Sequence, residues 1–199
     1  MHEIIVATGN AGKMGEFREI LHDLPLKLSS LSDHFQPVPS IPETGSTFVE
    51  NALLKARWVF ARKNIWVLAD DSGLEVDALD GAPGVRSARF AGENSSGETN
   101  NRKLLELLEG QPQASRTARF KCVIVLLTSA ENYFSAAGIC EGAIARAPRG
   151  SNGFGYDPLF VPRGFDRTFA ELGSAEKHAI SHRGKAFEKV KEHLHEFLE

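Results

Sequence analysis

The stretch Ile65–Leu74 reads Ile-Trp-Val-Leu-Ala-Asp-Asp-Ser-Gly-Leu, and the rest of the chain is organised around it. Its first five residues are apolar, which predicts a buried strand that ends at Ala69. Asp70 and Asp71 follow directly, so two carboxylates are expected at a strand end. Carboxylates this close repel each other, and a divalent cation that prefers oxygen ligands, such as Mg²⁺, would hold them together. An equally good interpretation is that both aspartates cap a turn.

A strand, a glycine-rich turn and a helix are predicted before this stretch. Glu3–Thr8 is β-branched and apolar, which is typical of an interior strand. The turn Gly-Asn-Ala-Gly-Lys (9–13) follows, and a helical pattern then runs to Pro25. Backbone N–H groups at such a turn can hold phosphate oxygens, and Lys13 would add a positive charge. A plain strand–helix turn explains the same residues, and Met14 replaces the Ser or Thr that a P-loop requires.

A second helix is predicted ahead of the Asp-Asp pair. Thr47 and Glu50 have the spacing of a capping box, which predicts a helix that begins there and runs to about Lys63. Glu43 lies in the loop just before this helix, where its carboxylate would either complete a metal shell or face solvent. Lys55 lies on the helix and would either reach a phosphate or be solvated.

The later part of the chain is richer in strands. Thr117–Thr128 and Tyr133–Ile144 are β-rich runs joined by a short polar turn, which predicts a long antiparallel hairpin. Thr99–Glu109 has the apolar spacing of an amphipathic helix, and a terminal helix is expected from Phe187. Lys27–Leu31 is expected to form an edge strand. Together these elements predict an α/β fold with a mixed sheet and helices packed on it.

A glycine-rich loop, Gly150–Pro158, carries two aromatic side chains and an aspartate. Aromatic rings on a flexible backbone can stack on a nucleobase, although a surface loop anchored by its aromatic residues fits the pattern equally well. Farther along, Lys177, His182 and Arg183 place hydrogen-bond donors near one predicted helix start. Solvated surface charge is the alternative interpretation of these three residues.

Composition excludes several classes of protein. A length of 199 residues suits one large domain or two closely fused lobes, and a net charge of −3 gives no general attraction to nucleic acid or to an anionic membrane. Two cysteines are too few for a disulfide scaffold. Neither a secretory signal nor an apolar run of about 20 residues is visible, so we expect a cytoplasmic protein.

Four segments taken together resemble the inosine/xanthosine triphosphate pyrophosphatase family, in its bacterial branch. They are Thr8–Lys13, Glu43–Gly45 with Phe48–Ala52, Ala69–Leu74, and Phe154–Pro158 with Ser181–Gly184. The resemblance spans almost the whole chain. It implies an elongated α/β fold of two lobes on a long mixed sheet flanked by helices, with the active site in a central cleft and residues 1–199 forming one domain.

The resemblance also implies an activity. It implies a Mg²⁺-dependent, homodimeric enzyme that hydrolyses ITP, dITP and XTP to the nucleoside monophosphate and pyrophosphate, thereby removing deaminated purines from the nucleotide pool. Asp71 is the implied proton acceptor, and Glu43, Asp71 and Asp70 are the implied metal ligands. The implied substrate contacts are Thr8, Gly9, Asn10, Ala11, Gly12, Lys13, Lys55, Ser72, Phe154, Gly155, Tyr156, Asp157, Lys177, His182 and Arg183.

Two other functions are compatible with parts of the sequence. A phosphotransferase or GTPase would use the loop 9–13, but no Ser or Thr follows Lys13. A nucleotide sensor without turnover would not need Asp71, Glu43 and Lys13 together. Detection of the product separates the three, because only the pyrophosphatase releases pyrophosphate.

Overall fold

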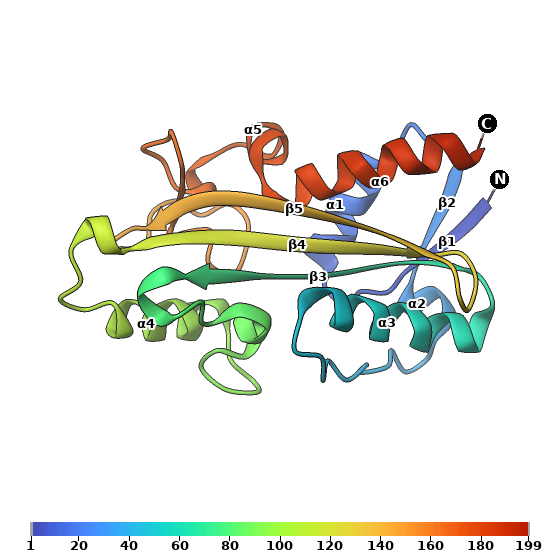
Figure 1. Ribbon diagram of the computed structural model, residues 1–199, viewed down its shortest axis with the longest axis horizontal. Helices are drawn as coiled ribbons and strands as arrows, with labels where there is room; N and C mark the ends of the chain where they lie inside the picture. The colour runs from blue at the N-terminus through green and yellow to red at the C-terminus, as the bar shows by residue number, and fades with distance from the viewer. Residues whose placement is uncertain (1, 199) are drawn as a thin grey trace. The chain divides into compact units, whose positions relative to one another are not determined.

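In this computed structural model, which describes residues 2–198, six strands form one sheet flanked by helices (Figure 1). The strands are β1 (His2–Val6), β2 (Leu26–Ser30), β3 (Trp66–Val76), β4 (Thr117–Leu127), β5 (Tyr133–Ile144) and β6 (Phe160–Pro162). The α-helices are α1 (Ala11–Ile20), α2 (Leu31–His34), α3 (Phe48–Lys63), α4 (Gly97–Leu107), α5 (Ser174–Ile180) and α6 (His182–Leu198). Short 3₁₀ turns lie at Asp77–Leu79, Gly84–Arg89, Gln113–Ser115 and Phe169–Glu171.

The sheet is mixed, with the strand order β2-β1-β3-β4-β5-β6. β1 pairs in parallel with both β2 and β3, whereas β6 pairs with β5 in the antiparallel sense. The interior position of β1 and the edge position of β2 confirm the sequence predictions. The predicted α/β fold with a mixed sheet and flanking helices is also confirmed.

The chain divides into two compact units. The first unit holds the described residues up to Asp71, Cys122–Ala137, and the residues from Gly184 onward. The second unit holds Ser72–Lys121 and Gly138–Arg183. The boundary therefore falls inside β3, between Asp71 and Ser72. The expected single domain with two lobes and a cleft stays a prediction.

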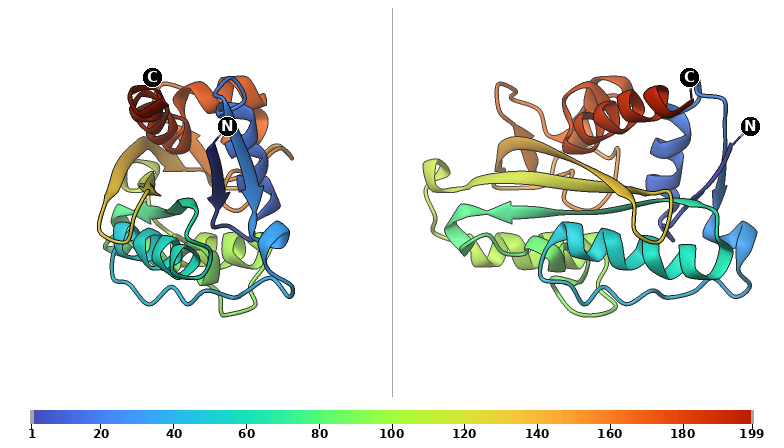
Figure 2. Two further views of the ribbon diagram at one scale, coloured as in Figure 1. Left: turned by 90° about the vertical axis from the view of Figure 1, so that its right-hand side faces the viewer. Right: turned by 45° about the vertical axis from the view of Figure 1, so that its right-hand side comes forward.

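Strand residues in the first unit alternate between two apolar clusters. Val6 and Leu68 pack with residues of α1 and α6, whereas Val67 and Ala69 pack with residues of α3. Because successive side chains of a strand point to opposite faces of its sheet, α1 and α6 cover one face and α3 covers the other. The left view of Figure 2 shows α3 and α6 on either side of the strands. The first unit is thus built in three layers.

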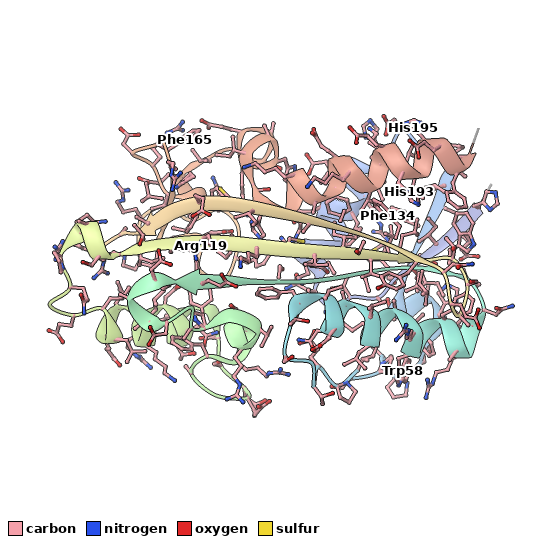
Figure 3. All side chains as sticks on the ribbon, in the orientation of Figure 1. Trp58, Arg119, Phe134, Phe165, His193 and His195 are labelled. Carbon is pink, nitrogen blue, oxygen red and sulfur yellow. The ribbon has the colours of Figure 1, made fainter. Side chains whose placement is uncertain are left out.

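Aromatic pairs fasten the helices to the first face. The rings of Phe17 on α1 and Phe187 on α6 meet edge to face, with their centroids 4.5 Å apart. Phe134 of β5 stacks on His193 of α6, with centroids 3.9 Å apart, and both side chains are labelled in Figure 3. Such pairs stabilise a packed core beyond the area they bury.

The second unit has an apolar cluster of its own. Leu74 of β3, Leu104 of α4 and Ile144 of β5 are fully buried in it, together with the rings of Phe160 and Phe169. α4 begins at a capping box in which the Ser96 hydroxyl accepts a hydrogen bond from the Thr99 N–H. This cap fixes the position of the first turn of α4.

Several boundaries differ from the sequence prediction, and α6 begins at His182, ahead of the expected Phe187. The strand expected to end at Ala69 continues to Val76, so Asp70 and Asp71 lie inside a strand and do not cap a turn. α1 ends at Ile20 and not at Pro25, and α4 begins at Gly97, ahead of the predicted Thr99. The helices described here are all too short or too polar to cross a membrane.

Candidate functional site

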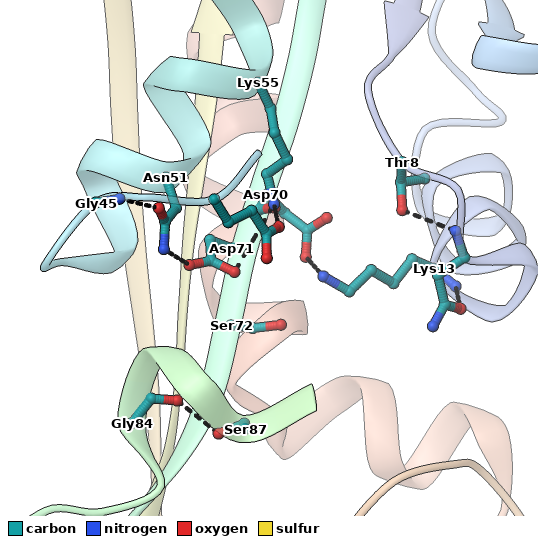
Figure 4. Close-up of polar contacts among 12 residues, drawn as sticks. Thr8, Lys13, Gly45, Asn51, Lys55, Asp70, Asp71, Ser72, Gly84 and Ser87 are labelled. Atoms are coloured by element: carbon teal, nitrogen blue, oxygen red, sulfur yellow. Dashed lines mark hydrogen bonds and ion pairs between the residues drawn. The ribbon is translucent and has the colours of Figure 1, made fainter. Parts of the chain in front are cut away.

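The predicted phosphate turn follows β1 and forms the start of α1. The Asn10 side chain accepts a hydrogen bond from the Lys13 N–H at 3.1 Å, and the Thr8 hydroxyl accepts one from the Asn10 N–H at 3.2 Å (Figure 4). Asparagine at this position caps a helix because its side-chain oxygen satisfies an N–H that the helix leaves open. The turn is therefore held by its own side chains at the positive end of the α1 dipole.

Lys13 and Asp70 form a buried ion pair. The Lys13 Nζ lies 2.7 Å from Asp70 Oδ2, and the Asp70 side chain is 1% exposed. Lys13 thereby connects the phosphate turn to the middle of β3, as Figure 4 shows. Lys13 is the last residue of the turn. Its ammonium would therefore be shared between Asp70 and a phosphate oxygen bound at the turn.

Lys55 brings together two carboxylates that are distant in sequence. Its Nζ lies 2.7 Å from Glu43 Oε1 and 3.7 Å from Asp71 Oδ1, and it also donates to the backbone carbonyl of Asp70. Glu43 and Asp71 therefore converge on one cationic position. We use the name "Asp71 cluster" for Lys13, Glu43, Lys55, Asp70 and Asp71.

Asn51 orients Asp71, and the sequence reasoning did not assign it to the site. Its Nδ2 donates to Asp71 Oδ2 at 3.1 Å, while its Oδ1 accepts from the Gly45 N–H at 2.8 Å. A Cβ on Gly45 would lie 2.7 Å from that Oδ1, so glycine is required there. The available signal was the spacing of Asn51 and Lys55, four residues apart on one face of α3.

Asp70 and Asp71 have different partners because they alternate along β3. Asp70 contacts Lys13, whose turn leads into α1, whereas Asp71 contacts Asn51 and Lys55 of α3. The two carboxylates have separate lysine contacts, and the expectation that one shared cation holds them together stays a prediction. The physical reason is the period of two in a strand, which sends neighbouring side chains to opposite faces.

Burial and charge act against each other at Asp71. Burial raises the pKa of the Asp71 carboxyl above its usual range, against the opposing influence of the Lys55 ammonium and the Asn51 amide. Burial alone would lower the pKa of Lys55, but the carboxylates of Asp70, Asp71 and Glu43 outweigh it, and the pKa is raised. Asp71 is therefore a stronger base than an exposed aspartate, and Lys55 stays charged.

Glu43 and Asp71 are the oxygen donors of the Asp71 cluster that a divalent metal could use. Among residues 2–198, no group of three or more His, Cys, Asp or Glu side chains is arranged to hold a metal ion. Glu43 and Asp71 do converge on one cationic position, which Lys55 occupies. Mg²⁺ is commonly held by one or two carboxylates together with phosphate oxygens of the substrate, so these hard oxygen donors are adequate.

A second cluster is built around Asp157 in the second unit. Asp157 Oδ2 accepts from the Phe154 N–H at 2.9 Å and from Lys177 Nζ at 2.8 Å. A Cβ on Gly153 would lie 2.1 Å from the same oxygen, and Gly153 has φ +75°, so glycine is required twice over. The carboxylate thus fixes both the aromatic loop and a buried lysine.

Phe154 presents a ring with two cations beside it. The ring centroid lies 5.3 Å from Lys177 Nζ and 5.2 Å from the Arg183 guanidinium carbon. Phe154 is 37% exposed, whereas Lys177 and Arg183 are buried. We use the name "Phe154 cluster" for Phe154, Asp157, Lys177 and Arg183. An accessible ring backed by donors suits a flat, electron-rich ligand.

The remaining predicted residues of this unit lie around the cluster, and of these Tyr156 and His182 are buried. Arg183 Nη2 donates to the Ser72 hydroxyl at 3.0 Å, and the His182 ring stacks on Phe120 with centroids 4.7 Å apart. The Tyr156 hydroxyl donates to the Ser87 carbonyl at 2.8 Å, and burial raises the Tyr156 pKa. Tyr156 is thus an anchor of the loop, and the exposed aromatic of the pair is Phe154.

The structure therefore places the predicted residues in two groups. The turn 8–13, Glu43, Lys55, Asp70 and Asp71 belong to the first unit, while Ser72, residues 154–157, Lys177, His182 and Arg183 belong to the second. The two groups are consecutive in the chain, because Asp71 is followed directly by Ser72. The first offers lysines and carboxylates, and the second offers an aromatic ring with donors.

Comparison with known proteins identifies close relatives. A model of the Ham1 family matches residues 4–193. The chain is 52% identical to a dITP/XTP pyrophosphatase of Exiguobacterium sibiricum over 98% of both chains, and 49% identical to one of Geobacter sulfurreducens over 98% of this chain and 97% of that one. A Ham1 protein structure from Coxiella burnetii is 46% identical and superposes with a TM-score of 0.90, covering 98% of this chain and all of the other.

Proposed function

Because the chain belongs to the Ham1 family, we propose that it acts on dITP, ITP and XTP through the two clusters described above. The protein is a nucleoside-triphosphate pyrophosphatase that hydrolyses non-standard purine nucleoside triphosphates to the monophosphate and pyrophosphate. The assignment of roles to residues is supported chiefly by one observation. Glu43 and Asp71 converge on a single cationic position beside the phosphate turn.

The phosphate end of the substrate suits the Asp71 cluster. The amides of the turn 9–13, at the positive end of α1, would bind oxygens of the departing pyrophosphate together with Lys13 and Lys55. These groups stabilise negative charge that grows as the bond between the α-phosphorus and the bridging oxygen breaks. Their positions are already fixed by the Asn10 cap and by the Lys13–Asp70 ion pair.

Asp71 is proposed as the general base. It would accept a proton from the water that attacks the α-phosphorus, and its raised pKa makes it a more effective acceptor near neutral pH. Asn51 donates to one oxygen of this carboxylate, and this hydrogen bond also fixes the direction of the other oxygen. Both features follow from the position of Asp71 inside β3 and under α3.

Nucleotide pyrophosphatases generally need a divalent metal, and Mg²⁺ is the ion that we propose here. Glu43 and Asp71 would hold it, with Asp70 as a further candidate ligand. When bound, the ion supplies positive charge that neutralises phosphate oxygens. Lys55 already satisfies the same two carboxylates and would turn toward the substrate as the ion binds.

The purine base suits the Phe154 cluster. Phe154 would stack on the base, and Arg183, with backbone groups near His182, would donate to O6 of hypoxanthine or xanthine. Adenine carries a donor at the corresponding position, so binding it would leave buried donors unpaired, at a cost of about 1–3 kcal/mol each. Lys177 and Asp157 hold the ring at the required place.

A product assay tests this proposal directly. Release of pyrophosphate is measured with ITP, dITP, XTP, GTP and ATP, each with Mg²⁺ and with a chelator. We expect rapid release from the first three substrates, little from the last two, and loss of activity with the chelator. Release of inorganic phosphate in place of pyrophosphate would support a GTPase or phosphotransferase, and tight ITP binding without turnover would support a sensor.

The finer properties are proposals of the same kind. We propose a homodimer, a cytoplasmic location and a single catalytic domain, in keeping with the family resemblance and with substrates that arise in the nucleotide pool. Light scattering coupled to size-exclusion chromatography tests the dimer. A mass equal to one chain at working concentration would contradict it.

A further inference from the structure

Helix α4 contacts the aromatic loop through Asn101, a residue with no role in the site described so far. Asn101 Nδ2 donates to the carbonyl of Gly155 at 3.0 Å, and the two residues are 54 positions apart in sequence. Gly155 directly follows Phe154 and has φ +61°, the left-handed region that favours glycine. The hydrogen bond therefore holds the loop at the residue next to the stacking ring.

The loop borders a cavity on the α4 side. This cavity has a volume of about 560 Å³, and Asn101, Leu105 and Phe154 are among the residues that line it. Because part of this side of the loop faces space and not packed side chains, packing alone does not fix its position. Asn101 provides a directed contact where close packing is incomplete.

Asn101 is an unusual choice for a purely structural position. It is 8% exposed, and its Oδ1 acceptor has no hydrogen-bond partner within the part of the chain that the structure describes. A buried acceptor without a partner is unfavourable, so an apolar side chain of similar size would serve stability at least as well. The N–H group that reaches Gly155 is what such a side chain would lack.

The helix itself is firmly anchored. Leu104 and Leu108 are fully buried in the core of the second unit, and the Ser96 cap fixes the first turn. A Cβ on Gly97 would lie 3.5 Å from the backbone of Gly155, so the first turn of α4 already lies against the loop. Because the helix is held in place, a hydrogen bond from it also holds the loop in place.

We propose that Asn101 is a positioning residue for base recognition: it holds the Gly155 carbonyl so that the Phe154 ring stands where a purine can stack. This inference rests on the proposed function of the Phe154 cluster. Asp157 holds the loop through the Phe154 N–H, and Asn101 holds it through the carbonyl of Gly155. The two bonds fix the peptide before Phe154 and the peptide after Gly155, so they hold the loop on both sides of the two-residue segment that carries the ring.

Two variants separate positioning from simple stability. Asn101→Leu removes the donor with little change of volume, and Asn101→Asp keeps the shape but places a carboxylate against a carbonyl. Arg102→Gln is the matched control, because Arg102 lines the same cavity from the same helix and pairs with Glu106 at 4.0 Å. The measurements are kcat and KM for ITP, the dissociation constant of IMP, inhibition by inorganic tripolyphosphate, and the melting temperature.

Positioning predicts a loss that depends on the base. Both Asn101 variants should bind IMP about fivefold to tenfold more weakly and raise the KM for ITP similarly, as expected for one lost hydrogen bond. Inhibition by tripolyphosphate, which has no base, should be unchanged, and kcat should change by less than about twofold. Arg102→Gln should behave as the unmodified enzyme. If Asn101→Leu fails to fold, Asn101→Asp decides the question.

Two results would overturn the role of Asn101 while the proposed function stands. One is unchanged IMP binding in a folded variant. The other is an equal loss for IMP and tripolyphosphate that accompanies a lower melting temperature. A natural enzyme that neither binds IMP nor hydrolyses ITP would overturn the proposed function as well, so the two failures are distinguishable.

Discussion

The Asp71 cluster contains one more carboxylate than lysine, whereas the Phe154 cluster contains one more cation than carboxylate. In the first, Lys13 and Lys55 lie against Glu43, Asp70 and Asp71, and three carboxylates so close together favour cationic partners. In the second, Lys177 and Arg183 lie beside an exposed ring, and Lys177 pairs with the carboxylate of Asp157. Two cations beside a ring favour an electron-rich partner.

This difference suggests a division between chemistry and recognition. Phosphate hydrolysis needs a base and charge that neutralises the phosphates, and these are present in the Asp71 cluster. Discrimination between purines needs a stacking surface with oriented donors, and these are present in the Phe154 cluster. Changes in the first cluster should lower turnover for every base, and changes in the second should alter the ratio between bases.

The largest expected effect comes from Asp71→Asn. Asparagine keeps the size of the side chain but cannot accept the proton, so kcat for ITP should fall by about 10²- to 10⁴-fold. Initial rates of pyrophosphate release check this, with IMP binding retained as evidence of an intact Phe154 cluster. Asp77→Asn is the control, because Asp77 bonds Thr117 and Arg119 outside both clusters. A folded Asp71→Asn enzyme with nearly normal turnover would contradict the role of Asp71.

Lys55→Met should have the next largest effect. It removes the cation between Glu43 and Asp71 and the proposed contact to the pyrophosphate, so kcat should fall about 10²-fold. The fall should be the same for ITP and XTP, because Lys55 does not contact the base in this account. Arg57→Met, an exposed change on the same helix, is the control. A loss confined to one base would break the comparison between the clusters.

Arg183→Ala should act on selectivity more than on turnover. Without the donor that we propose for O6, the preference for ITP over ATP in kcat/KM should shrink by about tenfold or more. Arg86→Ala, an exposed arginine of the second unit, should leave the ratio unchanged. Parallel rates with both nucleotides check the prediction. An unchanged ratio in the Arg183 variant would remove Arg183 from base recognition.

The smallest expected effect concerns stability and pH. The pKa of Asp71 is raised in the folded state, so the folded protein binds more protons and loses stability as pH rises from about 4 through that raised value. Asp71→Asn lacks this loss. With a chelator present, the melting temperature of the variant minus that of the natural protein should increase by a few degrees as the pH rises across this range. A gap that stays constant from acid to neutral pH would contradict the raised pKa.

Local signals in the sequence predicted much of the fold correctly. The capping box of Thr47 and Glu50 fixed the start of α3 because it involves four consecutive residues. The predicted length of β3 was wrong, because a strand tolerates polar residues when each has a partner. Those partners come from segments that are distant in sequence. Asp70 and Asp71 acquire theirs from α1 and α3, which only the folded sheet brings close.

The candidate site shows the same limit. The turn at residues 9–13 and Glu43 were candidates from their own residues, each with an alternative, and the family resemblance favoured the functional interpretation. The folded chain adds which atoms of these residues meet. Asn51 could have been found from its helical spacing to Lys55. Asn101 carried no sequence signal, because its partner is a backbone carbonyl 54 residues away. Because every residue has a backbone carbonyl, the amino-acid type of the partner does not reveal such a contact.

The alternation of Asp70 and Asp71 along β3 restricts the kinds of scaffold that could carry this chemistry. Each aspartate needs a lysine-bearing segment above its own face, so the strand must be covered on both sides. In a sheet with one face open to water, one carboxylate would be solvated, and only its neighbour on the covered face would have a lysine partner. Transplanting the dipeptide into a two-layer protein should therefore recreate half of the arrangement at most.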